Sequence, residues 1–219
     1  MKKVSCLMRA HYYWKAFTQK SIISFLSQDY SNKELIIVDG SGEGKQVLIS
    51  MGLYDHPEII YYYLPVKKSA KKFIEYKNNI ALARKQCEKL ATGYYLLSWD
   101  DDDINFPDRI TESVKSVQGF DAAMINDLFI FYENKYYLYP MNKGTYRPEF
   151  TAIYKKEKLP EMHKEGGYWN MQRSLRRLHV GTIMKNDIFI MRIHHGNNGT
   201  TKKDVFKTIN QLKPIKFTR

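Results

Sequence analysis

The stretch "YYLLSWDDDDINFPDRI", residues 94–110, runs from an apolar segment directly into four consecutive aspartates. The apolar part has the length of a buried strand, and Pro107 is suited to open a following helix, where its missing N–H costs nothing. The carboxylates of Asp100 to Asp103 repel one another, and nothing in the adjacent sequence neutralises them. The run is therefore either a solvated turn or a site for a cation.

Around this stretch, short apolar runs alternate with helical patterns. Strands are predicted at residues 3–8, 33–40, 58–64 and 94–99, and helices at 14–28, at 76–91 and after Pro107. Strands that alternate with helices predict an α/β fold with a mostly parallel sheet covered by helices. In such sheets ligands bind beyond the carboxyl ends of the strands, where both Asp39 and the aspartate run would lie. This shared edge favours a cation site over a solvated turn.

The second half of the chain has a different pattern. Residues 120–140 alternate around an Asn-Lys turn, which predicts antiparallel strands, and residues 167–178 are typical of a helix. Residues 179–195 indicate two strands around an Asn-Asp turn, and the basic stretch 200–219 admits a helix as one interpretation. The 219 residues suit one domain with a mixed C-terminal part.

The net charge of +12 is the most informative feature of the composition, with basic clusters at 67–72, 173–177 and 201–207. It favours an anionic partner, namely a phosphorylated small molecule, a nucleic acid or an acidic membrane surface, although it could also serve solubility alone. No apolar stretch approaches the roughly 20 residues of a membrane helix, and the N-terminus lacks signal-peptide features. Cys6 and Cys87 are interpreted as buried apolar residues, which fits a cytoplasmic location.

Carboxylates at a strand end form an oxygen-rich site for a hard divalent cation, Mn²⁺ or Mg²⁺. Such a metal uses one or two carboxylates and leaves positions open for substrate phosphates, so it can stabilise a departing diphosphate. The excess of basic residues would add to the same effect. The cation interpretation of the aspartate run thus also gives the positive charge a purpose.

Three segments, in the expected order, resemble the GT-A-fold glycosyltransferases, specifically the inverting family 2. They are "VSCLMRAHYYWKAFTQKSIISFLSQDYSNKELIIVDGS" (4–41), "LARKQCEKLATGYYLLSWDDDDINFPDRI" (82–110) and "MRIHHGNN" (191–198). The resemblance implies a single GT-A domain over residues 1–219, with a Rossmann-like, mostly parallel sheet and a mixed or antiparallel C-terminal part. Its nucleotide-sugar-binding half would be 1–119, its acceptor half 120–199, and 200–219 a basic tail.

The resemblance also implies roles for residues that match the family's motifs. Asp39 would bind the nucleotide base, and Arg84 would approach the nucleotide. Asp100 and Asp102 match the D-x-D motif. Asp100 would contact the ribose or the metal shell, and Asp102 would ligate Mn²⁺ or Mg²⁺, while Asp101 between them belongs to the nucleotide-sugar site. His195 would complete the metal or diphosphate site. Its neighbour His194 would have a structural role instead.

The sequence departs from the family pattern at several positions. Residues 8–11 read Met-Arg-Ala-His where Pro-Thr-Tyr-Asn is usual, Asp39 stands where a pair of aspartates is usual, and Lys85 replaces an asparagine. The catalytic base is the most affected, because Gly166 stands where the family carries an aspartate. Glu165 is therefore the candidate base, with Glu161 second.

The resulting hypothesis is a metal-dependent glycosyltransferase that moves a sugar from a nucleotide-diphosphate sugar, a UDP-sugar by preference, to an acceptor hydroxyl with inversion. The acceptor could be a glycan or a modified nucleic acid such as DNA. Two alternatives stay open. One is a basic nucleic-acid-binding protein whose tyrosine-rich runs offer stacking surfaces. The other is a GT-A fold that binds a nucleotide sugar without turnover.

Overall fold

The computed structural model describes residues 1–10, 15–65, 72–125, 127–139, 149–159, 178–183, 189–192 and 212–217. The first half alternates strands and helices as the sequence predicts. Its elements are β1 (Val4–Ala10), α1 (Lys15–Leu26), β2 (Lys33–Asp39), α2 (Gly44–Ser50), β3 (Ile59–Tyr63), α3 (Lys72–Leu90) and β4 (Tyr95–Ser98). The structure thus confirms the α/β pattern and adds the short helix α2, which the sequence pattern did not reveal.

Seven strands form the main sheet, in the order β10-β6-β9-β4-β1-β2-β3. The three strands from the second half are β6 (Ala122–Ile125), β9 (Ile153–Lys155) and β10 (Val180–Ile183). β9 is antiparallel to both of its neighbours, and the other pairs are parallel. β2 and β4 are buried at every position, as expected for strands covered on both faces. The predicted mostly parallel sheet is confirmed.

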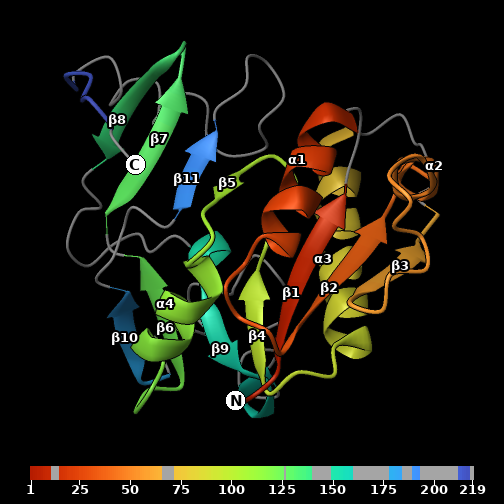
Figure 1. Cartoon of the computed structure of the whole chain (residues 1–219), viewed down its shortest axis with the longest axis horizontal. Coiled ribbons are helices and arrows are strands. Elements are labelled where there is room, and N and C mark those ends of the chain that lie inside the picture. Colours follow the sequence, from red (N-terminus) through yellow and green to blue (C-terminus); the bar gives the residue numbers. More distant parts are fainter. Residues whose placement is uncertain are drawn as a thin grey trace.

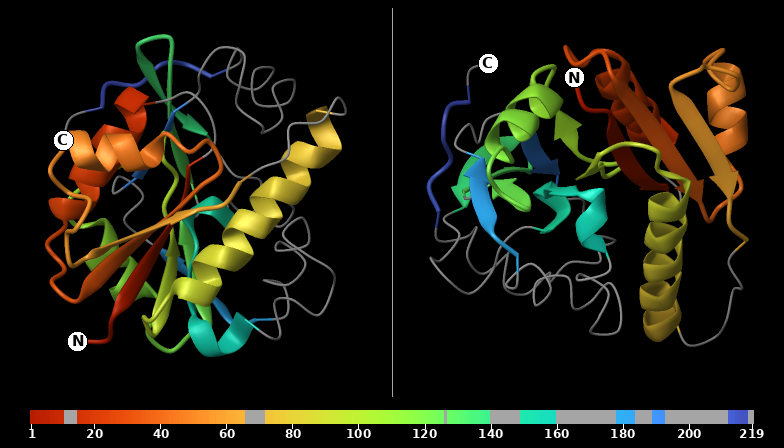
Figure 2. Two further views of the ribbon diagram at one scale, coloured as in Figure 1. Left: turned by 90° about the vertical axis from the view of Figure 1, so that its right-hand side faces the viewer. Right: turned by 90° about the horizontal axis from the view of Figure 1, so that it is seen from below.

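Helices cover both faces of the main sheet (Figures 1 and 2). Side chains alternate along β2, so Leu35 and Ile37 join the hydrophobic cluster that contains Phe25 of α1, residues of α2, and Ile110 of α4 (Arg109–Ser116). Ile36 and Val38 point the other way and join the cluster with Cys87 of α3. The sheet therefore separates α1, α2 and α4 on one face from α3 on the other.

A second, smaller sheet lies beside the main one, in the order β5-β11-β7-β8 (Figure 1). Its strands are β5 (Ile104–Asn105), β7 (Leu128–Tyr132), β8 (Lys135–Tyr139) and β11 (Phe189–Arg192). β7 and β8 form a hairpin that turns at Glu133 and Asn134, both with positive φ (47° and 59°). Consecutive positive φ angles at the two loop residues are those of a type I′ turn. The predicted Asn-Lys turn is therefore wrong by one residue.

Two further predictions for the second half need correction. The strands predicted within 179–195 do not pair with each other, because β10 belongs to the main sheet and β11 to the small one. Within 120–140 the predicted antiparallel pairing is confirmed for β7 and β8, whereas β6 belongs to the main sheet. Local alternation shows which side of a strand is buried but not which distant strand pairs with it. The predicted helix at 167–178 lies outside the described residues except for its last position.

The ends of this region differ from expectation as well. The part of the tail at residues 212–217 is not helical, and Ile215 there forms an isolated bridge to Tyr136 of β8. The short strand β9 and the flanking 3₁₀ turns η1 (Glu149–Thr151) and η2 (Lys156–Lys158) were not predicted. In the described parts of the chain, no helix combines the length and the apolar character needed to cross a membrane.

A buried carboxylate fixes the amino-terminal edge of the main sheet. Glu34 is 3% exposed and accepts hydrogen bonds from Ser5 Oγ (2.5 Å) and from the backbone N–H of Thr92 (2.7 Å). Lys3 Nζ lies 2.5 Å from its Oε2 atom. Burial by itself raises the pKa of Glu34, but the hydrogen bonds from Lys3, Ser5 and Thr92 outweigh that effect and lower the pKa below its usual 4.5. This carboxylate ties β1 and β2 to the turn before β4.

Replacing Glu34 by glutamine is expected to lower the free energy of unfolding at pH 7 by about 1–3 kcal/mol, because a charged acceptor is lost from a buried network. A carboxylate whose pKa is depressed by folding stabilises the protein above its unfolded-state pKa, and that stability is lost as the pH falls through the folded-state pKa. The variant should therefore lose less stability than the wild type below about pH 4.5. Urea unfolding from pH 7 to pH 3 measures both effects. The exposed Glu43 provides the control variant Glu43→Gln, and an equal pH dependence in Glu34→Gln and wild type would contradict the assignment.

Candidate active site

The strand order of the main sheet reverses between β1 and β4, and we use the term crevice for the space beyond the carboxyl ends of these two strands. From β1 the chain proceeds to β2 and β3 on one side, and then crosses by α3 to β4 on the other side of β1. Ligands of parallel α/β sheets bind beyond the carboxyl ends of the strands at such a reversal. Arg9 near the end of β1 and Asp100 just after β4 lie at this point.

Asp100 is held in place from both sides of the crevice. Its Oδ1 atom accepts a hydrogen bond from Arg9 Nη2 at 2.5 Å, and its backbone oxygen accepts one from Ser21 Oγ at 3.0 Å. The buried Trp99 donates its Nε1–H to the same Ser21 hydroxyl at 3.0 Å. Helix α1 and strand β1 therefore fix both the backbone and the carboxylate of Asp100. The role of Arg9 was not predicted. The only signal for it in the sequence is a basic residue at the end of a predicted strand, in a segment that differs from the usual family motif.

The remaining aspartates divide between the surface and the interior. Asp101 and Asp102 are partly exposed, whereas Asp103 is 6% exposed. Partial burial of the Asp101 carboxyl, together with the negative charges of Asp102 and Asp100, raises its pKa well above the usual range. The run thus presents closely spaced carboxylates at the carboxyl edge of β4, as the sequence predicted.

A buried guanidinium lies behind the aspartate run. Arg109, at the first position of α4, has no exposed surface and donates from Nη2 to the backbone oxygen of Thr151 at 2.9 Å. Burial lowers its pKa to about 10, an effect opposed by the negative charges of Asp103 and Asp100 and by Cys6. This internal positive charge partly offsets the carboxylates in front of it, and it was not predicted from the sequence.

The exposed part of the aspartate run fits a hard divalent cation. Mg²⁺ and Mn²⁺ at phosphate sites commonly use one or two carboxylates and complete their shell with substrate oxygens and water. Asp100 and Asp102 supply that number at the edge of the crevice. The described residues contain no group of three or more histidine, cysteine, aspartate or glutamate side chains arranged to enclose an ion. A site of this kind would therefore be completed by the substrate or by the rest of the chain.

Asp39 is at the expected edge but is fully engaged with its own turn. Its Oδ1 accepts from Ser41 N (2.7 Å) and Ser41 Oγ (2.6 Å), and its Oδ2 accepts from Gly44 N (2.7 Å) and Tyr61 OH (3.0 Å). An ionised carboxylate has about four acceptor positions, and four donors already occupy them. Asp39 thus organises the turn from Gly40 to the start of α2. Its predicted contact with a nucleotide base stays a prediction.

Arg84 is buried between α3 and β9. Its Nε donates to Glu88 Oε1 at 2.7 Å, its Nη2 donates to Tyr154 OH at 2.8 Å, and its guanidinium carbon lies 5.6 Å from the centre of the Tyr154 ring. These contacts join the helix to the strand that separates β4 from β6. The predicted approach of Arg84 to a nucleotide also stays a prediction.

The other predicted site residues lie outside the described part of the chain. They are the candidate bases Glu165 and Glu161, with Gly166 beside the first, and the late histidine His195. The described strand β11 ends at Arg192, three residues before His195. β11 runs antiparallel to β5, with Ile190 opposite Ile104, so the chain leaves β11 in the direction of the aspartate run.

The sequence profile of the family described as Glycosyl transferase family 2 matches residues 6–178. The chain belongs to this family. The match contains both strand ends of the crevice, Arg9 and Asp100, together with the whole aspartate run. The resemblance stated from the sequence motifs is therefore confirmed.

Solved structures show the same GT-A fold as this family 2 chain. S. aureus TarS 1–349 in complex with UDP has a TM-score of 0.66 at 12% identity, covering 87% of this chain and 60% of that one. The TarS complex with UDP-GlcNAc has a TM-score of 0.64 at 12% identity, with 91% and 61% covered. The mannosyltransferase PcManGT from Pyrobaculum calidifontis, in complex with GDP-Man and Mn²⁺, has a TM-score of 0.58 at 13% identity, with 93% and 58% covered. The chain thus spans about 60% of the length of the TarS fragment.

Proposed function

We propose that this family 2 protein transfers a sugar from a nucleotide-diphosphate sugar to a hydroxyl group of an acceptor. The observation that carries the proposal is the set of carboxylates at the end of β4, held by Arg9 at the point where the strand order reverses. Similar structures bound to UDP, UDP-GlcNAc and GDP-Man support a nucleotide-sugar donor. We favour a UDP-sugar as the donor, in agreement with the prediction from the sequence.

Asp102, with Asp100 and His195, would hold Mn²⁺ or Mg²⁺. When bound, such an ion stabilises the negative charge that develops on the leaving diphosphate. The Mn²⁺ complex of PcManGT supports this part of the proposal. β11 points toward the aspartate run at Arg192, which precedes His195 by three residues in the sequence, and this supports the inclusion of His195.

Residues that do not bind the metal would orient the donor. Arg9 keeps the Asp100 carboxylate in one position by a 2.5 Å hydrogen bond and adds a positive charge at the mouth of the crevice. The base would lie beside the turn that Asp39 organises, and Arg84 and Asp101 would belong to the same nucleotide-sugar site. Groups fixed before the substrate arrives lose little freedom on binding, which favours affinity.

The transfer itself would be a single in-line displacement with inversion at the anomeric carbon. Glu165 would accept the proton of the acceptor hydroxyl as the new glycosidic bond forms and the bond to the diphosphate breaks. A glycan, or a modified nucleic acid such as DNA, would be the acceptor.

Cys6 and Cys87 are both free and buried, which agrees with the cytoplasmic location expected from the sequence.

Thermal unfolding with a panel of nucleoside diphosphates and nucleotide sugars, each with and without Mn²⁺, tests the proposal. A ligand at about 100 times its dissociation constant should stabilise the protein by roughly 2.7 kcal/mol. We expect uridine ligands to raise the Tm when Mn²⁺ is present and not in its absence. Mn²⁺ without a nucleotide should not raise the Tm by the same amount. If every nucleotide leaves the Tm unchanged while DNA binds in a salt-sensitive manner without metal, the nucleic-acid-binding alternative is correct instead.

A further inference from the structure

Asn105, in β5 directly after the aspartate run, has a buried amide that forms no hydrogen bond with the described residues. The residue is 4% exposed, and neither its Nδ2 nor its Oδ1 atom has a hydrogen-bond partner in the described parts of the chain. Buried amides in folded proteins are nearly always paired, because an unpaired one lowers stability. An exception of this kind calls for an explanation in terms of function.

Gln28, a second buried amide beside the same segment, has a structural role that provides a comparison for Asn105. Gln28 is 6% exposed and donates from Nε2 to the backbone oxygens of Ser24 (2.9 Å) and Phe106 (2.7 Å). Its Oε1 accepts from the backbone N–H of Ile110 at 3.0 Å. Gln28 therefore fastens α1 to the chain between β5 and α4, and the fold does not need Asn105 for the same task.

The position of Asn105 relates it to the donor site. It lies three residues after Asp102, and β5 is at the edge of the small sheet, paired on one side only. Only two residues of β5 are in register with β11, Asn105 opposite Phe189 and Ile104 opposite Ile190. The amide therefore lies close in the chain to the carboxylates that would hold the diphosphate, on a strand with one paired edge.

The chemistry of the amide identifies the ligand group. A carboxamide offers two donors and one oxygen acceptor, and a hydroxyl group offers one donor and two acceptor positions, so the two groups satisfy each other. A neutral amide also suits a neutral group beside closely spaced carboxylates. The diphosphate of a nucleotide sugar lies between two neutral hydroxyl-bearing groups, the ribose and the transferred sugar. Because the ribose is expected at Asp100, the transferred sugar is the group left for Asn105.

We infer that Asn105 is a specificity-determining residue whose amide binds a hydroxyl of the sugar being transferred. The inference rests on the proposed function and deepens it, because it separates recognition of the sugar from recognition of the nucleotide. A site that hydrogen-bonds a substrate hydroxyl discriminates against ligands that lack it, since its own polar group is then left unpaired. The same unpaired state is seen here without a ligand.

Asn105→Leu, which keeps the branching of the side chain, and Asn105→Ala, which adds no volume, test the inference. Isothermal titration with UDP, GDP, UDP-GlcNAc and GDP-mannose, each with Mn²⁺, gives the dissociation constants. We expect both variants to bind the bare diphosphate within about twofold of wild type and the nucleotide sugar about tenfold more weakly, the loss of one ligand hydrogen bond. The Tm of Asn105→Leu should lie between that of wild type and a value about 2–4 °C higher.

Gln28→Leu is the matched control, and it should lower the Tm by several degrees because it removes three structural hydrogen bonds. The inference is overturned if both Asn105 variants bind the nucleotide sugar like wild type. It is also overturned if their Tm falls as in Gln28→Leu and all dissociation constants rise together, which would make Asn105 structural. A wild-type protein that binds neither diphosphates nor nucleotide sugars would instead refute the proposed function.

Discussion

Replacing Asp102 by asparagine is expected to abolish the metal-dependent binding of a nucleotide sugar while the protein stays folded. Asp102 is partly exposed at the carboxyl edge of β4, so the change removes a metal ligand without opening the core. The variant should lose the metal-dependent stabilisation of roughly 2.7 kcal/mol expected at saturating ligand. Because the ion would also stabilise the charge on the leaving diphosphate, donor turnover should fall by at least about 100-fold, which corresponds to roughly 2.7 kcal/mol of activation free energy. Thermal unfolding with and without Mn²⁺, together with donor consumption, measures both.

Asp55→Asn is a suitable control, because Asp55 is an exposed carboxylate in the turn before β3. It should change neither the metal-dependent rise in Tm nor turnover. Full activity in Asp102→Asn would exclude the aspartate run as the donor site. Inactivity with an unchanged, metal-dependent rise in Tm would place Asp102 in the chemical step instead of in metal binding.

Replacing Trp99 by alanine is expected to cause the largest loss of stability. The Trp99 side chain has no exposed surface and packs edge-on against Phe25 of α1, with ring centres 6.0 Å apart. Removing a buried aromatic side chain costs about 3–5 kcal/mol. The variant also loses the bond from Nε1 to Ser21 Oγ, the hydroxyl that holds the backbone of Asp100. Guanidinium unfolding should therefore show a much lower midpoint, and donor affinity should fall as well.

Trp99→Phe separates packing from hydrogen bonding at this position. Phenylalanine keeps most of the ring contact with Phe25 but lacks the N–H, so a loss of about 1 kcal/mol is expected. If Trp99→Phe proves as unstable as Trp99→Ala, the indole hydrogen bond, and not ring burial, holds α1 against β4.

The first half of the fold was predictable because each of its strands contains an apolar run, and because β1, β3 and β4 are followed by helical patterns. β2 and β4 are buried at every position, and their assignment did not depend on tertiary contacts. β5 and β9 have two and three residues, which is too short for a periodic signal. The division of the second half into two sheets depends on pairings between distant segments, such as β4 with β9, that local alternation cannot specify.

The position of the aspartate run at the ligand edge was predictable from the strand that precedes it, whereas the partners of individual side chains were not. Arg9 contacts Asp100 across 91 positions of sequence, and Arg84 contacts Tyr154 across 70. Asp39 was expected beside a ligand and is found bonded to Ser41 and Gly44. The two long-range contacts depend on the arrangement of distant strands and helices, whereas those of Asp39 are local to the turn that follows β2.

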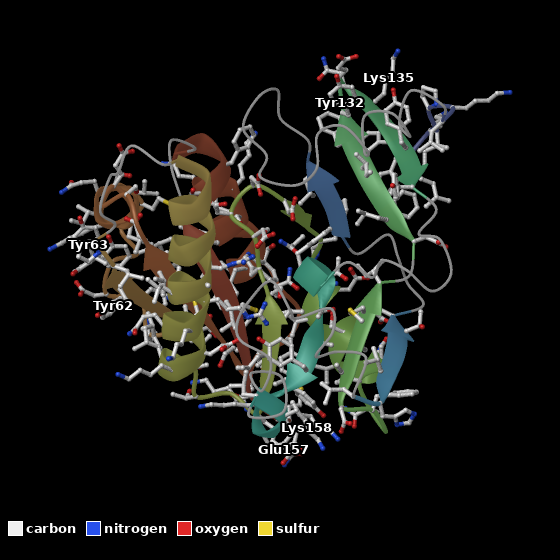
Figure 3. The ribbon with its side chains drawn as sticks, turned by 180° about the vertical axis from the view of Figure 1, so that it is seen from behind. Tyr62, Tyr63, Tyr132, Lys135, Glu157 and Lys158 are labelled. Atoms are coloured by element: carbon white, nitrogen blue, oxygen red, sulfur yellow. The ribbon has the colours of Figure 1, made fainter. Side chains whose placement is uncertain are left out.

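The exposed outer strand of the main sheet carries Tyr62 and Tyr63, which lie far from the tip of the β7–β8 hairpin marked by Tyr132 and Lys135 (Figure 3). Between these extremes, β1 is an interior strand of the main sheet although it is the first strand of the chain. Its neighbour β4 ends at Ser98. During synthesis from the N-terminus, β1, β2 and β3 can assemble early, but the other edge of β1 must stay open until β4 has emerged. An open strand edge is a template for pairing with other chains. The central crevice is therefore also the place where the growing polypeptide is longest exposed to misassembly.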